Sequence, residues 1–192
     1  MQLILASSSR YRRQMLERLR LPFSAIAPDI DETPQPDETP AHMALRLSRE
    51  KAHAVQLDRP GSVVIGSDQV ASLNGVPVGK PGNYERARLQ LQQLRGQTVL
   101  FHSAFCVTDG TREECMDVIT RCTFRELSDA EIDTYLRLEK PFDTAGSAKA
   151  EGLGISLMEA MQSEDPTAII GLPLIALSRT LRNFGLNPLL TQ

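Results

Sequence analysis

Hydrophobic and polar positions change their spacing several times along the chain, and each change predicts a new element. Residues 2–6 form an apolar run typical of a buried strand. From Ser9 onward, Tyr11, Met15 and Leu19 recur at helical spacing. The chain therefore begins with a strand, a serine-rich turn and a helix.

Residues 22–40 are rich in proline and acidic residues, which predicts a loop. The tetrapeptide Asp-Glu-Thr-Pro occurs in this stretch twice, at 31–34 and at 37–40. In the second copy, Thr39 is suited to cap a helix and Pro40 is suited to its first position. A helix is expected from there to about Leu57.

The rest of the chain mixes buried strands, hairpin turns and helices. A second buried strand is expected over 62–66, and Asn74-Gly75 predicts a hairpin between 69–73 and 76–78. The other expected elements are helices over 84–94, 128–139 and 173–184, two long strands within 97–124 joined at Asp109-Gly110, a loop over 142–152 and a strand over 155–161.

Units in which a helix follows a strand, mixed with antiparallel hairpins, predict an α/β fold with a mixed sheet flanked by helices. The 192 residues are enough for one domain, and no stretch has the composition of a linker. We therefore expect a single domain over 1–192, with room for two closely joined lobes.

Composition narrows the class of protein. Hydrophobic residues make up 41% of the chain, yet no apolar run reaches the length of about 18 residues that a membrane span needs, and the start has no long apolar segment of a secretory signal. The net charge of −3 argues against a general nucleic-acid binder. A cytoplasmic protein without a membrane or nucleic-acid partner is expected.

Cysteine and histidine residues indicate no site of their own. Cys106, Cys115 and Cys122 form no CxxC pair and are expected to be reduced thiols without a role. The three histidines are far apart in the sequence and form no HExxH motif, so a zinc site is not expected.

Charge is distributed unevenly near the start of the chain. Residues 1–20 contain five arginines and one acidic residue, whereas residues 29–38 contain five acidic residues and no basic one. A positive region followed by a negative one suits an anion that is bound together with a divalent metal ion. The alternative is two solvated faces.

The turn at residues 7–9 and the helix after it are suited to bind phosphate. A strand that ends in serines and opens a helix directs backbone N–H groups and the helix dipole at one point. Arginine adds a planar group that pairs with phosphate oxygens. No Walker A motif occurs in the chain. The alternative is that Ser9 only caps the helix and the arginines are solvated.

Four further positions could carry chemistry. Asp68 follows the apolar strand 62–66, and a carboxylate at a strand end can bind a metal or accept a proton from water. Its alternative role is a turn residue. Lys51, Lys80 and Glu151 are by themselves no different from surface residues.

Seven short motifs occur in an order that identifies a resemblance. The chain resembles the Maf family of nucleoside triphosphate pyrophosphatases over nearly its whole length, most closely the subgroup that acts on 7-methyl-GTP. Arg10 stands where this family usually has proline after its serine motif. The motifs are residues 6–13 (ASSSRYRR), 31–33 (DET), 50–52 (EKA), 67–69 (SDQ), 79–81 (GKP), 145–147 (AGS) with 151–152 (EG), and 171–173 (GLP).

The resemblance implies a fold, a reaction and a set of residues. The fold would be that of inosine-triphosphate pyrophosphatases, with a cleft between two lobes and a homodimer as the assembly. The reaction would be hydrolysis between the α- and β-phosphates with a divalent metal, Mg²⁺ or Mn²⁺, removing modified nucleotides. The implied residues are Ser7, Arg12, Arg13, Lys51 and Lys80 for phosphate, Glu32 and Asp68 for metal, Asp68 as general base, and Tyr11, Gln69 and Glu151 for base choice.

Other functions stay open at this point. One is a non-catalytic regulator, linked to cell division, that binds nucleotide or nucleic acid. The others are a pyrophosphatase of the dTTP or UTP type and a phosphohydrolase that cuts a different bond. The presence of both Glu32 and Asp68 beside the basic residues favours an enzyme, because binding alone would not need the acids.

Overall fold

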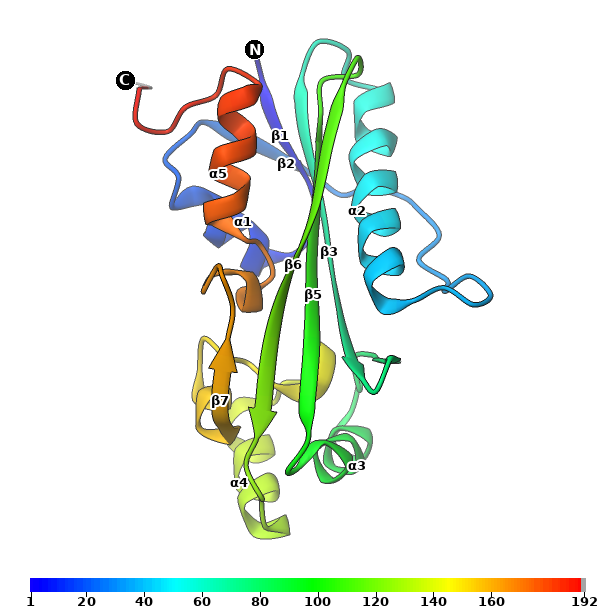
Figure 1. Ribbon diagram of the computed structural model, residues 1–192, viewed down its shortest axis with the longest axis vertical. Coiled ribbons are helices and arrows are strands. Elements are labelled where there is room, and N and C mark those ends of the chain that lie inside the picture. The colour runs from blue at the N-terminus through cyan, green and yellow to red at the C-terminus, as the bar shows by residue number, and fades with distance from the viewer. Residues whose placement is uncertain (191–192) are drawn as a thin grey trace.

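A computed structural model describes residues 1–190 and contains one seven-stranded mixed sheet flanked by helices (Figure 1). This confirms the predicted fold class. The strands are β1 (Leu3–Ala6), β2 (Phe23–Ile26), β3 (Val63–Leu73), β4 (Val76–Val78), β5 (Thr98–Thr108), β6 (Glu113–Phe124) and β7 (Met158–Gln162). The α-helices are α1 (Arg10–Glu17), α2 (Pro40–Leu57), α3 (Tyr84–Leu94), α4 (Asp129–Glu139) and α5 (Leu174–Asn183), with 3₁₀ turns at Ala145–Ser147, Leu153–Leu157 and Ala168–Ile170.

The strand order is β2-β1-β3-β5-β6-β7, and β4 also pairs with β3. β1 lies parallel to both β2 and β3, and all other pairs are antiparallel. The long strands β3, β5 and β6 run through most of the length of the molecule (Figure 1). Within residues 1–190, no helix is both long and apolar enough to cross a membrane.

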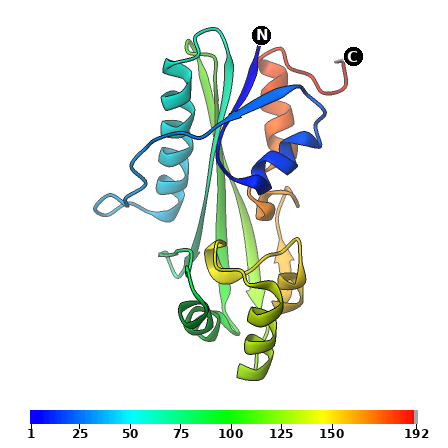
Figure 2. The same ribbon diagram turned by 180° about the vertical axis from the view of Figure 1, so that it is seen from behind.

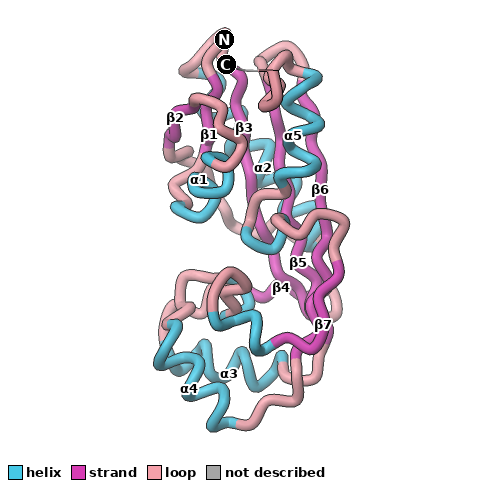
Figure 3. The backbone as a smooth tube through the Cα atoms, turned by 90° about the vertical axis from the view of Figure 1, so that its left-hand side faces the viewer, coloured by secondary structure: helices cyan, strands magenta, loops and turns pink. Residues whose placement is uncertain are grey.

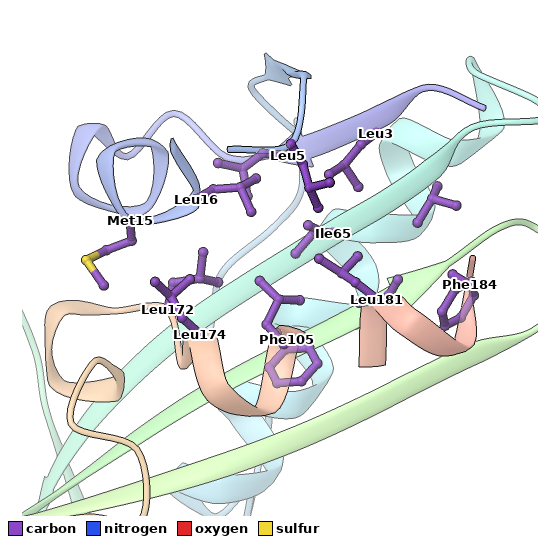
Figure 4. Packing of buried hydrophobic residues seen from close by; sticks show 14 of the residues in the cluster. Leu3, Leu5, Met15, Leu16, Ile65, Phe105, Leu172, Leu174, Leu181 and Phe184 are labelled. Atoms are coloured by element: carbon purple, nitrogen blue, oxygen red, sulfur yellow. The ribbon is translucent and has the colours of Figure 1, made fainter. Parts of the chain in front are cut away.

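The two largest apolar clusters lie along these long strands. In the first, side chains of β1, α1 and α5 meet Ile65 and Phe105 of the sheet (Figure 4). In the second, α3 and α4 cover Phe101 and Phe124. The β1–α1–α5 elements and the α3–α4 elements lie toward opposite ends of the molecule, with β3 and β5 contributing to both clusters (Figure 3).

Helix α2 packs against the face of the sheet opposite to α5, as Figures 1 and 2 show. Successive residues of a strand point to opposite faces. Val64 and Cys106 therefore pack with Ala52 of α2, while Ile65 and Phe105 pack in the first cluster. This alternation decides which polar side chains of β3 can meet α2.

Local signals placed most helices correctly, whereas one loop prediction and one strand prediction were wrong. Thr39 caps α2 and Pro40 is its first residue, as predicted. The predicted loop over 22–40 contains β2, which forms by pairing with the distant β1. The two strands predicted over 62–66 and 69–73 are one continuous strand, because β5 pairs with β3 along this whole stretch. The strand predicted over 155–161 is β7, preceded by a 3₁₀ turn.

The expectation of three reduced cysteines was also wrong. The antiparallel register of β5 and β6 places Cys106 directly opposite Cys115, and the two form a disulfide. The two cysteines are nine positions apart in sequence, so no short motif indicates the pair. Cys122 is a buried free thiol, and burial raises its pKa to about 12.

Candidate active site

The candidate site lies where one edge of β3 is left uncovered. β1 pairs with β3 only as far as Gly66, and β4 pairs with the same edge only from Ala71 onward. A cavity of about 620 Å³ opens beside the intervening residues. Its lining includes nine of the predicted site residues: Ser7, Tyr11, Arg12, Glu32, Lys51, Asp68, Gln69, Lys80 and Glu151.

Asp68 therefore lies within a strand, and not after one as the sequence predicted. It is nevertheless beside a strand end, because the neighbouring β1 stops at Ala6, level with Gly66. A carboxylate on this uncovered part of β3 can face both α2 and the cavity. Asp68 is buried, and its chemistry is decided by the charged groups that surround it.

The serine turn between β1 and α1 faces the cavity, as its lining shows. Ser7 is buried, and its Oγ accepts a hydrogen bond from the Ser9 N–H at 3.1 Å. Ser9 is the N-cap of α1, and its Oγ accepts from the Arg12 N–H at 3.4 Å. These bonds hold the turn so that the first turn of the helix points toward the cavity, the arrangement that binds anions.

Arg12 is half-buried, and its Nε donates to the Gly171 carbonyl at 3.1 Å. Burial lowers the pKa of its guanidinium, while the charges of Asp68 and Glu32 act in the opposite direction. One of its five N–H groups is thus used to fix the side chain, which leaves others for a ligand. Arg12 brings a fixed positive charge to the wall that adjoins both acids.

Lys51 of α2 joins the two predicted metal-binding acids. Its buried Nζ lies 2.7 Å from Glu32 Oε1 and 2.6 Å from Asp68 Oδ1. Burial would raise the pKa of Glu32, but the hydrogen bond and charge of Lys51 outweigh it, so this pKa lies below its ordinary value. Glu32 is therefore ionised at neutral pH, as a metal ligand must be.

These residues fit a divalent cation. Two carboxylate oxygens already lie within 2.7 Å of one positively charged atom, the ammonium nitrogen of Lys51. Oxygen donors of this kind suit hard cations such as Mg²⁺ and Mn²⁺. Glu32 has most of its side chain exposed, so an ion could approach it from the cavity.

The sequence that builds this site matches a known protein family. The sequence model of the protein family described as "Maf-like protein" matches residues 2–184. The chain belongs to the Maf family. The predicted resemblance is thereby confirmed, and the uncovered edge of β3 is the candidate active site of a Maf protein.

Three similar proteins share one name, 7-methyl-GTP pyrophosphatase. The 7-methyl-GTP pyrophosphatase of Bordetella avium is 69% identical over 187 residues, covering 97% of this chain and 95% of its own. The protein of the same name from Bordetella pertussis is 67% identical over 187 residues, covering 97% and 94%. That from Ralstonia nicotianae is 60% identical over 183 residues, covering 94% of each.

A more distant likeness exists among solved structures. The structure of the Staphylococcus aureus Ham1 protein is 15% identical to this Maf protein and has a TM-score of 0.46. The match covers 66% of this chain and 73% of that one. At this level the likeness does not bear on the site.

The Maf structure does not bring Arg13 into the cavity. The Arg13 side chain is 64% exposed, and its Nε lies 3.5 Å from Glu17 Oε1 one helical turn away. Arg10, Tyr11 and Arg12 line the cavity, whereas Arg13, the next residue of α1, does not. The sequence places both arginines at the start of α1, but the packing of α1 selects Arg12.

Tyr11 lies at the cavity together with Arg10, which sequence reasoning treated only as a departure from the family pattern. Arg10 Nη2 donates to the Tyr11 hydroxyl at 2.8 Å, and its guanidinium carbon lies 4.8 Å from the centre of the ring. Arg10 thus covers one face of the ring. Glu151 and Lys80 also line the cavity, and both are exposed.

Gln69 has its amide nitrogen fully engaged. Its Nε2 donates to Ser103 Oγ at 2.9 Å and to the carbonyls of Ala168 and Ile169, each at 3.1 Å. These bonds tie β3 to the 3₁₀ turn that forms part of the cavity wall. Gln69 therefore positions the wall segment in addition to lining the cavity.

Asp165 is a buried acid that sequence reasoning missed. Its Oδ2 accepts from the Ile175 and Ala176 N–H groups at 2.6 and 3.3 Å, and its Oδ1 accepts from the Thr167 N–H at 3.0 Å. It thereby holds the segment that carries Gly171 onto the start of α5. The sequence signal that could have indicated this role is an acidic residue shortly before the helix predicted over 173–184.

Proposed function

We propose that this Maf protein is a nucleoside triphosphate pyrophosphatase that hydrolyses 7-methyl-GTP to 7-methyl-GMP and diphosphate. Relatives at 60–69% identity that bear the name 7-methyl-GTP pyrophosphatase support this proposal. The physiological role that follows is the removal of a modified nucleotide.

One observation carries the proposal: Glu32 and Asp68 share Lys51 within the same cavity as Arg12. A triphosphate carries about four negative charges, which must be neutralised without covering the α-phosphorus. Basic side chains that pair with phosphate oxygens, together with two carboxylates that can hold a metal ion, meet that need. Ser7, Arg12, Lys51 and Lys80 would bind the phosphate oxygens.

Asp68 would act as general base, accepting a proton from the water that attacks the α-phosphorus. Glu32 and Asp68 would hold Mg²⁺ or Mn²⁺, which supplies positive charge to the phosphates when bound. Lys51 compensates the charge of both acids. Its long, flexible side chain lets the ammonium turn toward a phosphate when the acids find another cation.

Three residues would select the base. Methylation at N7 makes guanine positively charged, so stacking on Tyr11 gains a cation–π contribution of about 0.5–2 kcal/mol. Arg10 already lies over one face of that ring, so the base would take the other face or displace Arg10. Glu151 can accept from the guanine N1–H and exocyclic amine, a donor pair that thymine and uracil lack. Gln69 would act on the base through the wall segment that it holds.

Product analysis with 7-methyl-GTP, GTP, dTTP and UTP tests the proposal. Diphosphate is the expected product, with the largest kcat/KM for 7-methyl-GTP. Orthophosphate would indicate a different phosphohydrolase, and binding without any product would indicate a regulator. An equal kcat/KM for dTTP or UTP would contradict the base pocket. The double variant Tyr11→Arg, Glu151→Gln is expected to reduce the preference for 7-methyl-GTP.

The homodimer and the cytoplasmic location stay predictions. Sedimentation of the full chain tests the first, and fractionation of cells that express it tests the second.

A further inference from the structure

A second cluster of metal-binding side chains lies between α2 and the β5–β6 hairpin. The sulfur atoms of Cys106 and Cys115 and a carboxylate oxygen of Glu113 all lie within 4.8 Å of one another. His53 of α2 approaches the same carboxylate, with its Nε2 2.7 Å from Glu113 Oε2. None of these four residues lines the cavity of the candidate active site.

We propose that Cys106, Cys115, Glu113 and His53 form a second metal site, which binds a thiophilic divalent cation of the zinc class when the disulfide is reduced. Two thiolates, an imidazole and a carboxylate are ligands that zinc accepts in tetrahedral sites. Ligand atoms about 2.0–2.3 Å from one tetrahedral ion lie about 3.3–3.8 Å from one another. The 4.0 Å between Cys106 Sγ and Glu113 Oε2 is already close to that separation.

Burial and charge agree with such a site. Cys106 is completely buried, whereas Cys115 is exposed and can be reached by a reductant or a metal ion. Two thiolates and a carboxylate would carry three negative charges. A divalent cation balances two of them, and Arg49, which pairs with Glu113, compensates the remaining charge.

The disulfide makes the site dependent on redox state. A dithiol can reduce it: two electrons and two protons pass to the sulfurs, the S–S bond breaks, and the dithiol closes its own disulfide. Cys115 can then turn away from Cys106 by rotation about its side chain, since it lies at the surface. Metal binding would release the two thiol protons.

The sequence gives no sign of this site. His53 lies 60 residues before Glu113, and the cysteines have the spacing of no known zinc motif. Only the register of β5 with β6 and the packing of α2 on the sheet bring the four side chains together. The inference is independent of the proposed pyrophosphatase activity.

The test uses the full chain reduced by a phosphine, which takes oxygen from water to become the phosphine oxide while the sulfurs receive two protons. The reduced protein is titrated with Co²⁺ without oxygen. Thiolate ligation gives an intense charge-transfer band in the near ultraviolet, which carboxylates at the candidate active site cannot give. We expect the band to saturate at one Co²⁺ per chain and to disappear when Zn²⁺, which binds more tightly, replaces Co²⁺.

Matched variants separate this site from unspecific thiol binding. Cys115→Ser, at the exposed sulfur, is expected to lose the band, while Cys122→Ser is expected to keep it. His53→Gln is expected to weaken Co²⁺ affinity at least about tenfold, the lower end of what even an indirect partner of a metal contributes. A reduced wild type without the band, or a Cys115→Ser variant that keeps it, would overturn the proposal.

Discussion

Two triads of charged side chains each centre on a cation of α2. They differ in how many carboxylate oxygens the cation leaves unpaired. In the first, Lys51 lies between Glu32 and Asp68. In the second, Arg46 lies between Glu38 and Glu50. The two glutamates of the loop occupy the same place in the two Asp-Glu-Thr-Pro copies.

We call the second triad closed, because the planar guanidinium of Arg46 pairs with both oxygens of Glu38. Arg46 donates through Nε and Nη2 to both oxygens of Glu38, at 2.6 and 2.8 Å. The hydrogen bond to Arg46 lowers the pKa of Glu38, and its counterpart raises the pKa of Arg46. A bidentate pair of this kind uses up the carboxylate and holds the loop against α2.

The first triad stays open because lysine is a point charge that occupies one oxygen of each acid. It also borders the cavity, whereas the residues of the second triad do not line it. An identical tetrapeptide thus places its glutamate at the cavity in one copy and in a salt bridge away from the cavity in the other. The difference follows from the cation that the fold places beside each glutamate, a lysine for Glu32 and an arginine for Glu38.

The largest expected effect comes from breaking the open triad at its buried acid. Asp68→Asn should lower kcat by about 10²–10⁴-fold, the contribution of a positioned general base, or by more if metal is also lost. The matched change in the closed triad, Glu50→Gln, should leave kcat within about twofold. A Asp68→Asn protein that retains more than about a tenth of wild-type kcat would remove Asp68 from the mechanism.

The next largest difference is expected between two neighbouring arginines of α1, one at the cavity and one outside it. Arg12→Ala should lower kcat/KM for the triphosphate about 10–150-fold, since a hydrogen bond to a charged group contributes about 1.5–3 kcal/mol. Arg13→Ala should change it less than about threefold, because this side chain pairs with Glu17 outside the cavity. Steady-state kinetics on both variants decide the point. Equal losses would mean that Arg13 reaches the substrate after all.

The two glutamates of the repeated tetrapeptide should respond differently to metal. Glu32→Gln should raise the Mg²⁺ concentration needed for half-maximal activity at least about tenfold. Glu38→Gln should leave it unchanged and instead lower the free energy of unfolding by up to about 1 kcal/mol, or about 2–4 °C in Tm. Activity against Mg²⁺ concentration and thermal melting measure the two effects. Equal metal dependence would show that the wrong copy was assigned.

The smallest expected effect is on the pH dependence of stability. The pKa of Glu38 lies below its ordinary value of 4.5 in the folded protein, so its stabilising contribution is present above that pH. It is lost as the pH falls through the folded pKa. Below about pH 4.5, Tm should therefore fall less steeply in Glu38→Gln than in the wild type. Identical slopes would mean that the closed triad does not stabilise the fold.

Features that depend on neighbouring residues were predicted well. Ser128 and Glu131 form the expected capping box of α4, and the hairpin at Asn74-Gly75 is present. These signals work because the hydrogen bonds that they describe join residues only a few positions apart. The turn at Asp109-Gly110, which joins the two long strands within 97–124, was found for the same reason.

Features that depend on distant residues were predicted less well. β2 exists only through its pairing with β1, and β3 continues past Asp68 only because β5 pairs with it. The uncovered edge between β1 and β4, which places Asp68 beside the cavity, is likewise a product of strand order.

The sequence alone determined the family, the order of most elements and the residue types that a triphosphate site needs. Only the tertiary structure decided that Arg12 faces the cavity while Arg13 faces solvent. It also decided that Glu32 meets a lysine and Glu38 an arginine, and that Cys106 meets Cys115. The physical reason is that a side chain's chemistry depends on the burial and charge around it, and packing brings that environment from far along the chain.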